Sequence, residues 1–402
     1  MVKIGKHRTP VLVYLDTSDY SRFGDVIRGK ADSATESLFN ELLALKKNGV
    51  AQFAFSAAIL SELFQFNPEF PGTTQSKAEA VERLCGEVAF YWPMRSIAHD
   101  VALHSRHTPA DKKPLSLRSE WFPSASEKLA DFRGTLEAKL ASDLASKSYS
   151  NRKERRSAEA KARNFPFEIL ASPIIDLVAS SYNLDRSDVK RAITPTLKGN
   201  ISSLEGSRRM FDAIARPTSF VRSYFSDINE DQSLPTWISD VGVAMQKSLI
   251  ELRENLRNFD KNELSNQLPA GIDLSSRMIL HELARQAEPL VNEFAPRFNS
   301  GNLFRDVDQL LTVPALNLFF NAYRVLVEQA AGMHGDGHDP ERSAFGDLFH
   351  LLYLPHSDLW RCDRRFRNVV SKVCGVYDHA VVNRLSDLPA MIASLKIRER
   401  QF

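Results

Sequence analysis

The feature that most constrains the fold is an unbroken apolar run, VLVYL at residues 11–15, that ends directly at Asp16. Such a run of apolar and β-branched residues is typical of a strand buried on both faces of a parallel sheet. A second run, at 50–55, follows a helical stretch at 34–47, and Ser56 then begins another helix as its N-cap. Strands and helices that alternate in this way predict a parallel sheet covered by helices.

The middle of the chain has a different pattern from its two ends. Apolar runs typical of strands become rare after about residue 105. Segments with helical periodicity, separated by prolines, continue from there to about 331. The α/β pattern then resumes with a helix at 343–354 and strands at 359–362 and near 375–379. We therefore predict an α/β fold in which a parallel sheet flanked by helices is interrupted by a mainly α-helical insertion. The predicted parts are 1–104 and 341–402 for the α/β domain and 105–340 for the insertion.

Composition and charge exclude several functional classes. Fifty-two basic and fifty acidic residues give a net charge of +2, so a nucleic-acid surface must arise from local clustering. No apolar run approaches the roughly 18 residues of a membrane span, and the first run is too short for a signal peptide. The three cysteines form no CxxC pair, and Walker A, GxGxxG and GxSxG motifs are missing from the sequence. We expect a protein of the reducing cytoplasm that is not associated with membranes.

Four acidic residues occupy corresponding positions at one edge of the predicted sheet. Asp16 and Asp363 each follow a strand directly, Glu62 lies on the helix after the second strand, and Asp347 lies on the helix before the strand at 359–362. Ligands of open parallel sheets bind outside the carboxyl ends of the strands. Carboxylates that converge there repel one another unless a cation neutralises them, and an all-oxygen cluster suits Mg²⁺ or Mn²⁺ better than zinc. One or two such ions activate water for attack on a phosphodiester.

Asp347 has the most informative neighbours of the four. The segment AFGDLFHLLYL is otherwise largely apolar, so an isolated carboxylate there would cost several kcal/mol unless it were paired or bound to a metal. His350 follows three residues later on the same helix face and is an auxiliary candidate. For any single acid, chance placement or the helix dipole is an equally good explanation, and the argument rests on all four together.

The segments that contain these acids resemble the motifs of PIN-like (PilT N-terminus-like) nuclease domains. The first motif corresponds to VLVYLDTSDYSRF at 11–23, and the second to FAFSAAILSELFQF at 53–66. The third and fourth correspond to GDLFHLLYLPHSDLWRCDRRFRNVV at 346–370, and LTVPALNLFFNAYRV at 311–325 is similar to a proline-containing helix that precedes them in some bacterial members. The resemblance covers about 165 residues at the two ends and rests on order and context.

The resemblance implies a metal-dependent endonuclease, with RNA favoured over DNA as the substrate and homodimer formation common in the family. By the resemblance, the metal-binding acids are Asp16, Glu62, Asp347 and Asp363. Thr17 and Ser18 would orient Asp16 or a metal-bound water. Two departures from the family pattern are the long middle segment and an extra acid, Asp358, which is either a further ligand or the partner of a neighbouring arginine.

Two groups of basic residues are candidates for phosphate contacts. Arg361, Arg364 and Arg365 lie beside Asp363 and would form a clamp for a substrate phosphate. Residues 147–163 contain seven basic and two acidic residues, a local charge of +5, which indicates either a solvated helix face or a surface for the phosphate backbone.

Three alternative functions remain open from the sequence. A phosphatase with an aspartyl nucleophile would also place an Asp after its first strand, but its usual second Asp is replaced here by Ser18. A catalytically silent PIN-like protein would bind nucleic acid or a protein partner without turnover. A DNA-directed nuclease in defence or repair, or a toxin, would use the same metal-assisted chemistry.

Overall fold

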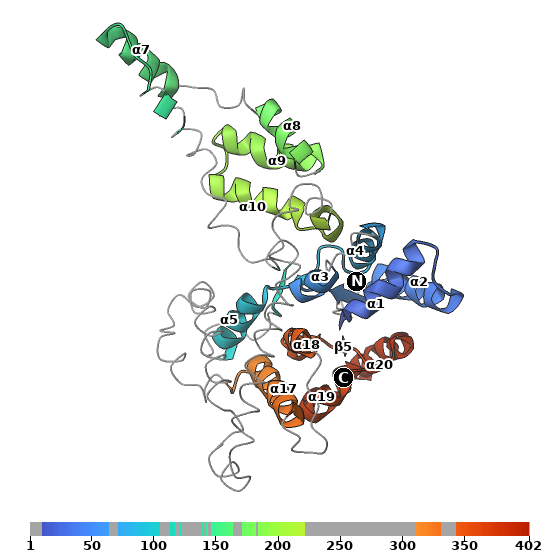
Figure 1. Ribbon diagram of the computed structural model, residues 1–402. Helices are drawn as coiled ribbons and strands as arrows, with labels where there is room; N and C mark the ends of the chain where they lie inside the picture. The colour runs from blue at the N-terminus through green and yellow to red at the C-terminus, as the bar shows by residue number, and fades with distance from the viewer. Residues whose placement is uncertain are drawn as a thin grey trace, which may run out of the picture. The chain divides into compact units, whose positions relative to one another are not determined.

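The structure, a computed structural model, describes much of the two ends of the chain and part of its middle (Figure 1). The described residues are 10–63, 71–104, 113–116, 121, 139, 142–143, 146–163, 171–181, 184–221, 311–330 and 343–401. They belong to two compact units, one formed by 1–121 with 232–402 and the other by 122–231. The second unit covers most of the first half of the predicted insertion.

A parallel sheet of four strands organises the first unit. Its strands are β1 (Val11–Tyr14), β2 (Ala51–Ala54), β5 (Leu359–Arg361) and β6 (Val381–Val382), in the order β2-β1-β5-β6. Val13 pairs with Phe53 of β2 on one side and with Leu359 of β5 on the other. The predicted α/β class with a parallel sheet is therefore confirmed, and the sheet joins strands from both ends of the chain.

Helices cover β1 so that the whole strand is buried. Helices α1 (Thr17–Ile27), α2 (Ser33–Lys47) and α4 (Pro71–Cys85) pack on one another, and α20 (Leu388–Gln401) packs on β1. In the view of Figure 1 the blue helices lie above the sheet and the red helix α20 lies below it. Every residue of β1 is buried, as expected for a strand with apolar side chains on both faces.

Short elements extend the amino-terminal part of this unit. Helix α3 (Ala57–Leu63) follows β2, and Ser56 accepts a hydrogen bond from the backbone of Ile59 at 3.4 Å, so its predicted role as an N-cap is confirmed. Strand β3 (Ala89–Phe90) pairs antiparallel with β4 (Leu115–Ser116) in a separate small sheet. Helix α5 (Pro93–His104) lies between these two strands in the sequence.

The carboxyl-terminal part of the unit is mostly helical. Its elements are α17 (Pro314–Ala330), α18 (Ser343–Leu351), the 3-10 turn η3 (Leu354–His356), α19 (Arg367–Val373), η4 (Gly375–Ala380) and η5 (Leu385–Asp387). Helix α17 packs on α18 and α19, so this helix lies with the sheet-bearing unit although the sequence analysis groups it with the insertion.

The strand predicted near 375–379 is wrong, because this segment forms η4. Gly375 adopts a positive φ of 47°, and Tyr377 donates a backbone hydrogen bond to Cys374 at 2.8 Å. A turn held by such short-range bonds cannot join the sheet, and the strand begins only at Val381.

The described residues of the second unit form helices. They are α7 (Arg152–Arg163), α8 (Ala171–Ser181), α9 (Arg186–Leu197) and α10 (Ser203–Ile214). Helices α8, α9 and α10 share a small core around Ile175, Val189 and Leu197. A Cβ added to Gly206 of α10 would lie 1.9 Å from the Thr196 hydroxyl, so the close approach of α9 and α10 requires glycine there. Residues 222–310 of the predicted helical insertion lie outside the described residues.

None of the helices in the described parts of the chain is both long enough and apolar enough to span a membrane.

Candidate metal centre

Asp16 links the end of β1 to the start of α1 at the carboxyl edge of the sheet. It is the N-cap of α1, and its Oδ1 accepts a hydrogen bond from the backbone of Ser18 at 2.7 Å. Asp19 completes a capping box, because its Oδ2 accepts a hydrogen bond from the Asp16 backbone at 3.3 Å. These local bonds fix the backbone of Asp16 where the strand ends.

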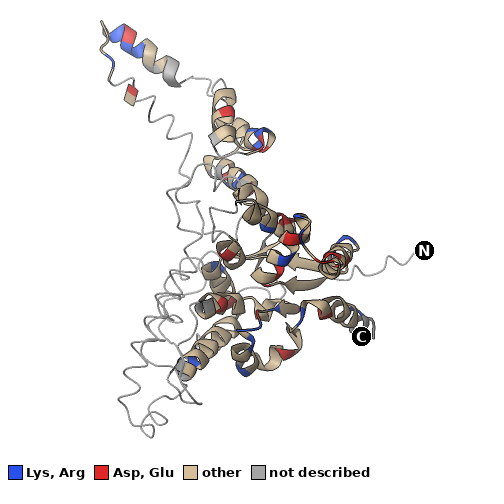
Figure 2. Cartoon of the chain, turned by 45° about the vertical axis from the view of Figure 1, so that its right-hand side comes forward, with Lys and Arg blue, Asp and Glu red and all other residues tan. Residues whose placement is uncertain are grey.

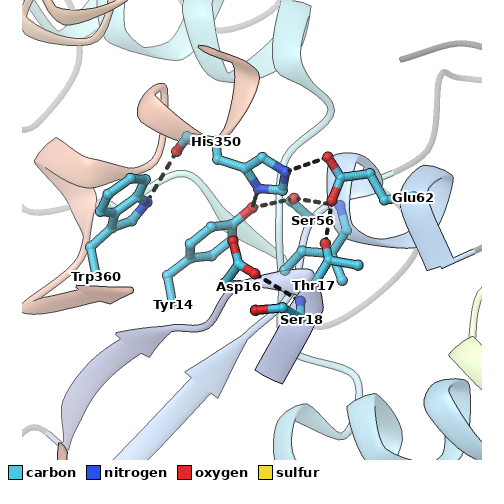
Figure 3. A network of polar contacts seen from close by, with 9 residues as sticks. Tyr14, Asp16, Thr17, Ser18, Ser56, Glu62, His350 and Trp360 are labelled. Atoms are coloured by element: carbon cyan, nitrogen blue, oxygen red, sulfur yellow. Dashed lines mark hydrogen bonds and ion pairs between the residues drawn. The ribbon is translucent and has the colours of Figure 1, made fainter. Parts of the chain in front are cut away.

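Glu62 connects three elements around this edge (Figure 3). It lies on α3, its Oε2 accepts a 2.5 Å hydrogen bond from the Thr17 hydroxyl, and its Oε1 lies 3.2 Å from Nε2 of His350 on α18. Thr17 therefore contacts Glu62 rather than the Asp16 side chain, and Ser18 contributes its backbone amide while its side chain is exposed.

The ring of His350 is held from both sides in the buried part of the centre. Its Nδ1 lies 2.6 Å from the Tyr14 hydroxyl, which in turn lies 2.7 Å from the Ser56 hydroxyl. The indole of Trp360 donates a 3.1 Å hydrogen bond to the His350 carbonyl. Strand β1, strand β5 and the start of α3 thus all contribute to fixing this imidazole (Figure 3).

Asp347 lies one helical turn before His350 on α18 and faces the same space. One ligand atom from each of Glu62, Asp347 and His350 lies within 4.8 Å of the other two. Two ligands bound to one ion at about 2.0–2.2 Å are at most about 4.4 Å apart, so a shift of a few tenths of an ångström would let all three bind the same cation. Among the described residues, this is the group of His, Cys, Asp and Glu side chains that can hold a metal ion.

The charges of this site favour an added cation. Burial raises the pKa of Asp347 well above its ordinary value, and the negative charges of Glu62, Asp16 and Asp363 raise it further. The charge of His350 opposes these shifts, and a divalent ion placed here would likewise favour the charged form of the carboxyl group. The donor types and the electrostatics therefore both fit a divalent ion.

The pKa values of Glu62 and His350 are shifted in the directions that favour the charged form of each group. Burial alone would raise the pKa of Glu62, but the charge and hydrogen bond of His350 and the hydrogen bond from Thr17 lower it. Burial alone would lower the pKa of His350, but the charge and hydrogen bond of Glu62, with the charge of Asp347, raise it to about 9. The charge of His350 therefore lowers the pKa of both Glu62 and Asp347.

Asp363 follows β5 at the same edge as Asp16. Its side chain is partly buried, and its Oδ1 accepts a 3.1 Å hydrogen bond from the backbone of Arg365. Its charge acts on Asp347 together with that of Asp16. The structure therefore places Asp16, Glu62 and Asp363 within electrostatic range of Asp347. Of the four acids, only Glu62 and Asp347 belong to the group whose ligand atoms lie within 4.8 Å of one another.

The neighbouring arginines differ in their surroundings. Arg361 is buried, its Nη2 lies 3.2 Å from Oδ1 of the buried Asp19, and it also donates a hydrogen bond to the Cys362 carbonyl. A guanidinium engaged in this way does not face a solvent phosphate, so the expected phosphate contact of Arg361 does not fit its position. Arg364 and Arg365 are exposed directly after Asp363.

Asp358 lies at the opposite end of the strands. Its Oδ2 accepts a 2.7 Å hydrogen bond from the Leu12 backbone, and its Oδ1 lies 3.0 Å from the ammonium group of Lys113. Leu12 is near the start of β1, whereas Asp16 follows its end. Both expectations for Asp358 are therefore corrected, because its position excludes a ligand of this centre and its partner is a lysine.

Sequence reasoning missed three residues of this site. Tyr14 is the polar end of an apolar run, and nothing in the pattern shows that its hydroxyl meets His350. Ser56 was recognised as an N-cap, but not as the partner of Tyr14 at 2.7 Å. Asp19 was detectable, because an acid three residues after an N-cap is the signature of a capping box.

No protein-family model, curated protein or solved structure matches this chain. The function must therefore be inferred from the chemistry of the site.

Proposed function

We propose that the chain is a PIN-like, metal-dependent endonuclease that hydrolyses phosphodiester bonds, with RNA as its substrate. The observation that supports this most is the position of Asp347, a carboxyl group whose pKa is raised by burial and by three neighbouring acids. Burial and like charges make such a group costly to ionise without a cation, and divalent ions activate water for phosphodiester hydrolysis in many nucleases.

Each side chain has a defined task in this proposal. Asp16, Glu62, Asp347 and Asp363 would hold one or two Mg²⁺ or Mn²⁺ ions, which supply an activated water and neutralise the phosphate when bound. Thr17 orients Glu62 through its 2.5 Å hydrogen bond. Arg364 and Arg365, exposed beside Asp363, would bind the substrate phosphate.

One observation favours a second candidate, a PIN-like protein that binds nucleic acid without turnover. The imidazolium of His350 already neutralises Glu62 through the 3.2 Å contact. If that pair is permanent, the carboxylate is not available to an ion. This candidate differs from the first in predicting binding without divalent-dependent cleavage.

Cleavage assays on purified protein test the proposal. Labelled single- and double-stranded RNA and DNA are incubated with Mn²⁺, Mg²⁺ or EDTA for the wild type and for Asp16→Asn and Asp347→Asn. We expect divalent-dependent cleavage of RNA by the wild type and a loss of at least about a hundredfold in both variants, as for groups that act directly at the reacting atoms. Asp32→Asn, which changes the exposed N-cap of α2, is the matched control and should cleave like the wild type.

The folding of each variant is checked separately by circular dichroism and thermal unfolding. Asp347→Asn should be at least as stable as the wild type, because it removes a buried acid with a raised pKa. Full activity of either variant would refute the assignment. Binding of RNA without cleavage in any divalent ion would establish the second candidate instead.

A further inference from the structure

The group of side chains that could bind one ion together includes a nitrogen donor, His350. Glu62 and Asp347 each offer a carboxylate oxygen and His350 offers one ring nitrogen, with separations of at most 4.8 Å. Nε2 is the ring nitrogen that lies 3.2 Å from Glu62. His350 is 5 % exposed, so its ring has few alternative positions. An ion that binds Asp347 and Glu62 here lies within reach of an imidazole nitrogen as well as of oxygens.

The second nitrogen of the ring has the kind of partner that orients metal-binding histidines. Histidines that bind metals through one nitrogen usually donate the other N–H to a fixed acceptor, which sets the tautomer and the ring orientation. The Tyr14 hydroxyl lies 2.6 Å from Nδ1, is fully buried on β1, and lies 2.7 Å from the Ser56 hydroxyl. If Nδ1–H donates to Tyr14 and Tyr14 donates to Ser56, the lone pair of Nε2 faces the Glu62 carboxylate (Figure 3).

We propose that His350 is a nitrogen ligand of this centre, oriented by Tyr14, and that the centre takes a first-row transition ion such as Mn²⁺ in preference to Mg²⁺. Mg²⁺ prefers oxygen ligands in a strict octahedron, whereas first-row transition ions also accept imidazole nitrogen, with an affinity that rises from Mn²⁺ along the row to Cu²⁺. The inference rests on the proposed metal centre and goes beyond it, because it adds a ligand and selects the class of ion.

The same geometry has a structural alternative. His350 and Glu62 form an ion pair at 3.2 Å, and such a pair can serve only to neutralise a buried carboxylate. In that case the ring nitrogen never approaches an ion. The two explanations differ in whether a bound ion has a nitrogen in its coordination shell.

Electron spin echo spectroscopy of Mn²⁺ bound to the full-length protein measures this directly. We expect ¹⁴N modulation of the Mn²⁺ echo in the wild type, and its replacement by the ¹⁵N pattern when only the histidines are ¹⁵N-labelled. This comparison uses no mutation and so does not depend on the folding of a variant. Competition with Mg²⁺ should require at least about ten times more Mg²⁺ than Mn²⁺ to displace half of the bound ion.

Three variants connect the signal to His350. His350→Gln should lose the ¹⁴N modulation and bind Mn²⁺ at least about tenfold more weakly. Tyr14→Phe should keep the modulation but bind Mn²⁺ about 10–100-fold more weakly, as for other residues that orient a ligand. His356→Gln is the matched control, because His356 is also a mostly buried histidine paired with an acid, Asp100 at 2.9 Å, outside this centre. It should bind Mn²⁺ like the wild type.

The results also separate this inference from the proposed nuclease activity. Mn²⁺ binding without ¹⁴N modulation, modulation that survives in His350→Gln, or equal affinity for Mg²⁺ and Mn²⁺ would each overturn the inference. If the protein cleaves RNA but shows no nitrogen signal, the nuclease proposal stands with oxygen ligands alone. If the nitrogen signal is present but neither RNA nor DNA is cleaved, His350 is a ligand and the nuclease proposal fails.

Discussion

Asp19 is fully buried beside the candidate centre and joins its two strand ends. Its carboxylate accepts a hydrogen bond from the Asp16 backbone and lies 3.2 Å from Arg361, which is two residues before Asp363. Burial raises the pKa of Asp19 from 3.8 to about 7, although the charge of Arg361 opposes the shift. This ion pair thus connects the backbones that carry two of the proposed ligands.

The stability of the protein should depend on pH through Asp19. Because its pKa is raised on folding, the folded protein binds more protons than the unfolded chain between pH 3.8 and about 7. The free energy of unfolding should therefore fall as the pH rises through this window. Asp19→Asn cannot titrate, so its stability relative to the wild type should improve as the pH rises from about 5 to 7. Urea unfolding in EDTA at several pH values measures the difference.

A control separates this effect from that of other groups. Asp32→Asn should show the wild-type pH dependence over the same window, because a hydrogen bond from the Thr35 backbone lowers the pKa of Asp32. His350, with its pKa raised to about 9, contributes stability that is lost only above its ordinary pKa of 6.5, and it does so in all three proteins. A pH dependence that is identical in wild type and Asp19→Asn would contradict the prediction.

At the scale of elements, α7 is a helix that packing alone does not explain. Its side chains include no apolar residue larger than alanine, and its described positions are mostly exposed. Asn151 accepts hydrogen bonds from the backbones of Lys153 and Glu154 at 3.1 and 2.9 Å, and Glu154 accepts from Ser150. The helix is therefore started by local capping, and both basic and acidic residues lie along it (Figure 2).

If α7 contacts the phosphate backbone, binding should become less sensitive to salt when its charges are removed. The variant Arg152→Gln/Lys153→Gln/Arg156→Gln removes three exposed cations. For single-stranded RNA each phosphate contact contributes about 0.7 to the slope of log K against log salt, so up to about 2 units of slope should be lost. Binding is measured between about 50 and 200 mM salt. EDTA is present throughout, because it prevents divalent-dependent cleavage of the RNA.

The matched control removes three exposed lysines from other helices and their ends. Lys47→Gln/Lys190→Gln/Lys198→Gln changes the net charge by the same amount, but on α2, on α9 and at the C-cap of α9. Its slope should stay close to that of the wild type. Equal slopes for all three proteins would mean that α7 is an ordinary solvated helix.

At the scale of the whole molecule, the two compact units should respond to different perturbations. Leu197 is 2 % exposed in the core of the helical unit, and Leu42 is fully buried on α2 of the sheet-bearing unit. Leu197→Ala should destabilise only the helical unit, by about 2–5 kcal/mol, and Leu42→Ala only the other. Calorimetry should resolve two thermal transitions. Leu42→Ala should lower the midpoint temperature of one of them, and Mn²⁺ should raise the midpoint temperature of that same transition only. A single transition shifted by all three perturbations would contradict this.

The sequence was sufficient for features that depend on local pattern. The apolar run before Asp16 indicated a doubly buried strand, Ser56 indicated a helix start, and the acids at strand ends indicated a shared edge. Contacts between polar atoms far apart in the chain were not predictable, because periodicity reports burial and not the partner of a given hydroxyl or guanidinium. The pairing of Tyr14 with His350 and of Asp19 with Arg361 belongs to this class.

The pairing of β1 with β5 joins residues such as Leu12 and Asp358, which are 346 positions apart. At about 5–20 residues per second, a ribosome needs roughly 20–70 s to bridge that interval. Between the synthesis of Glu62 and that of Asp347, the nascent polypeptide carries Asp16 and Glu62 without Asp347 or Asp363. Translation products that stop between these two residues therefore lack half of the carboxylates, so a complete centre can arise only after Asp363 has been synthesised.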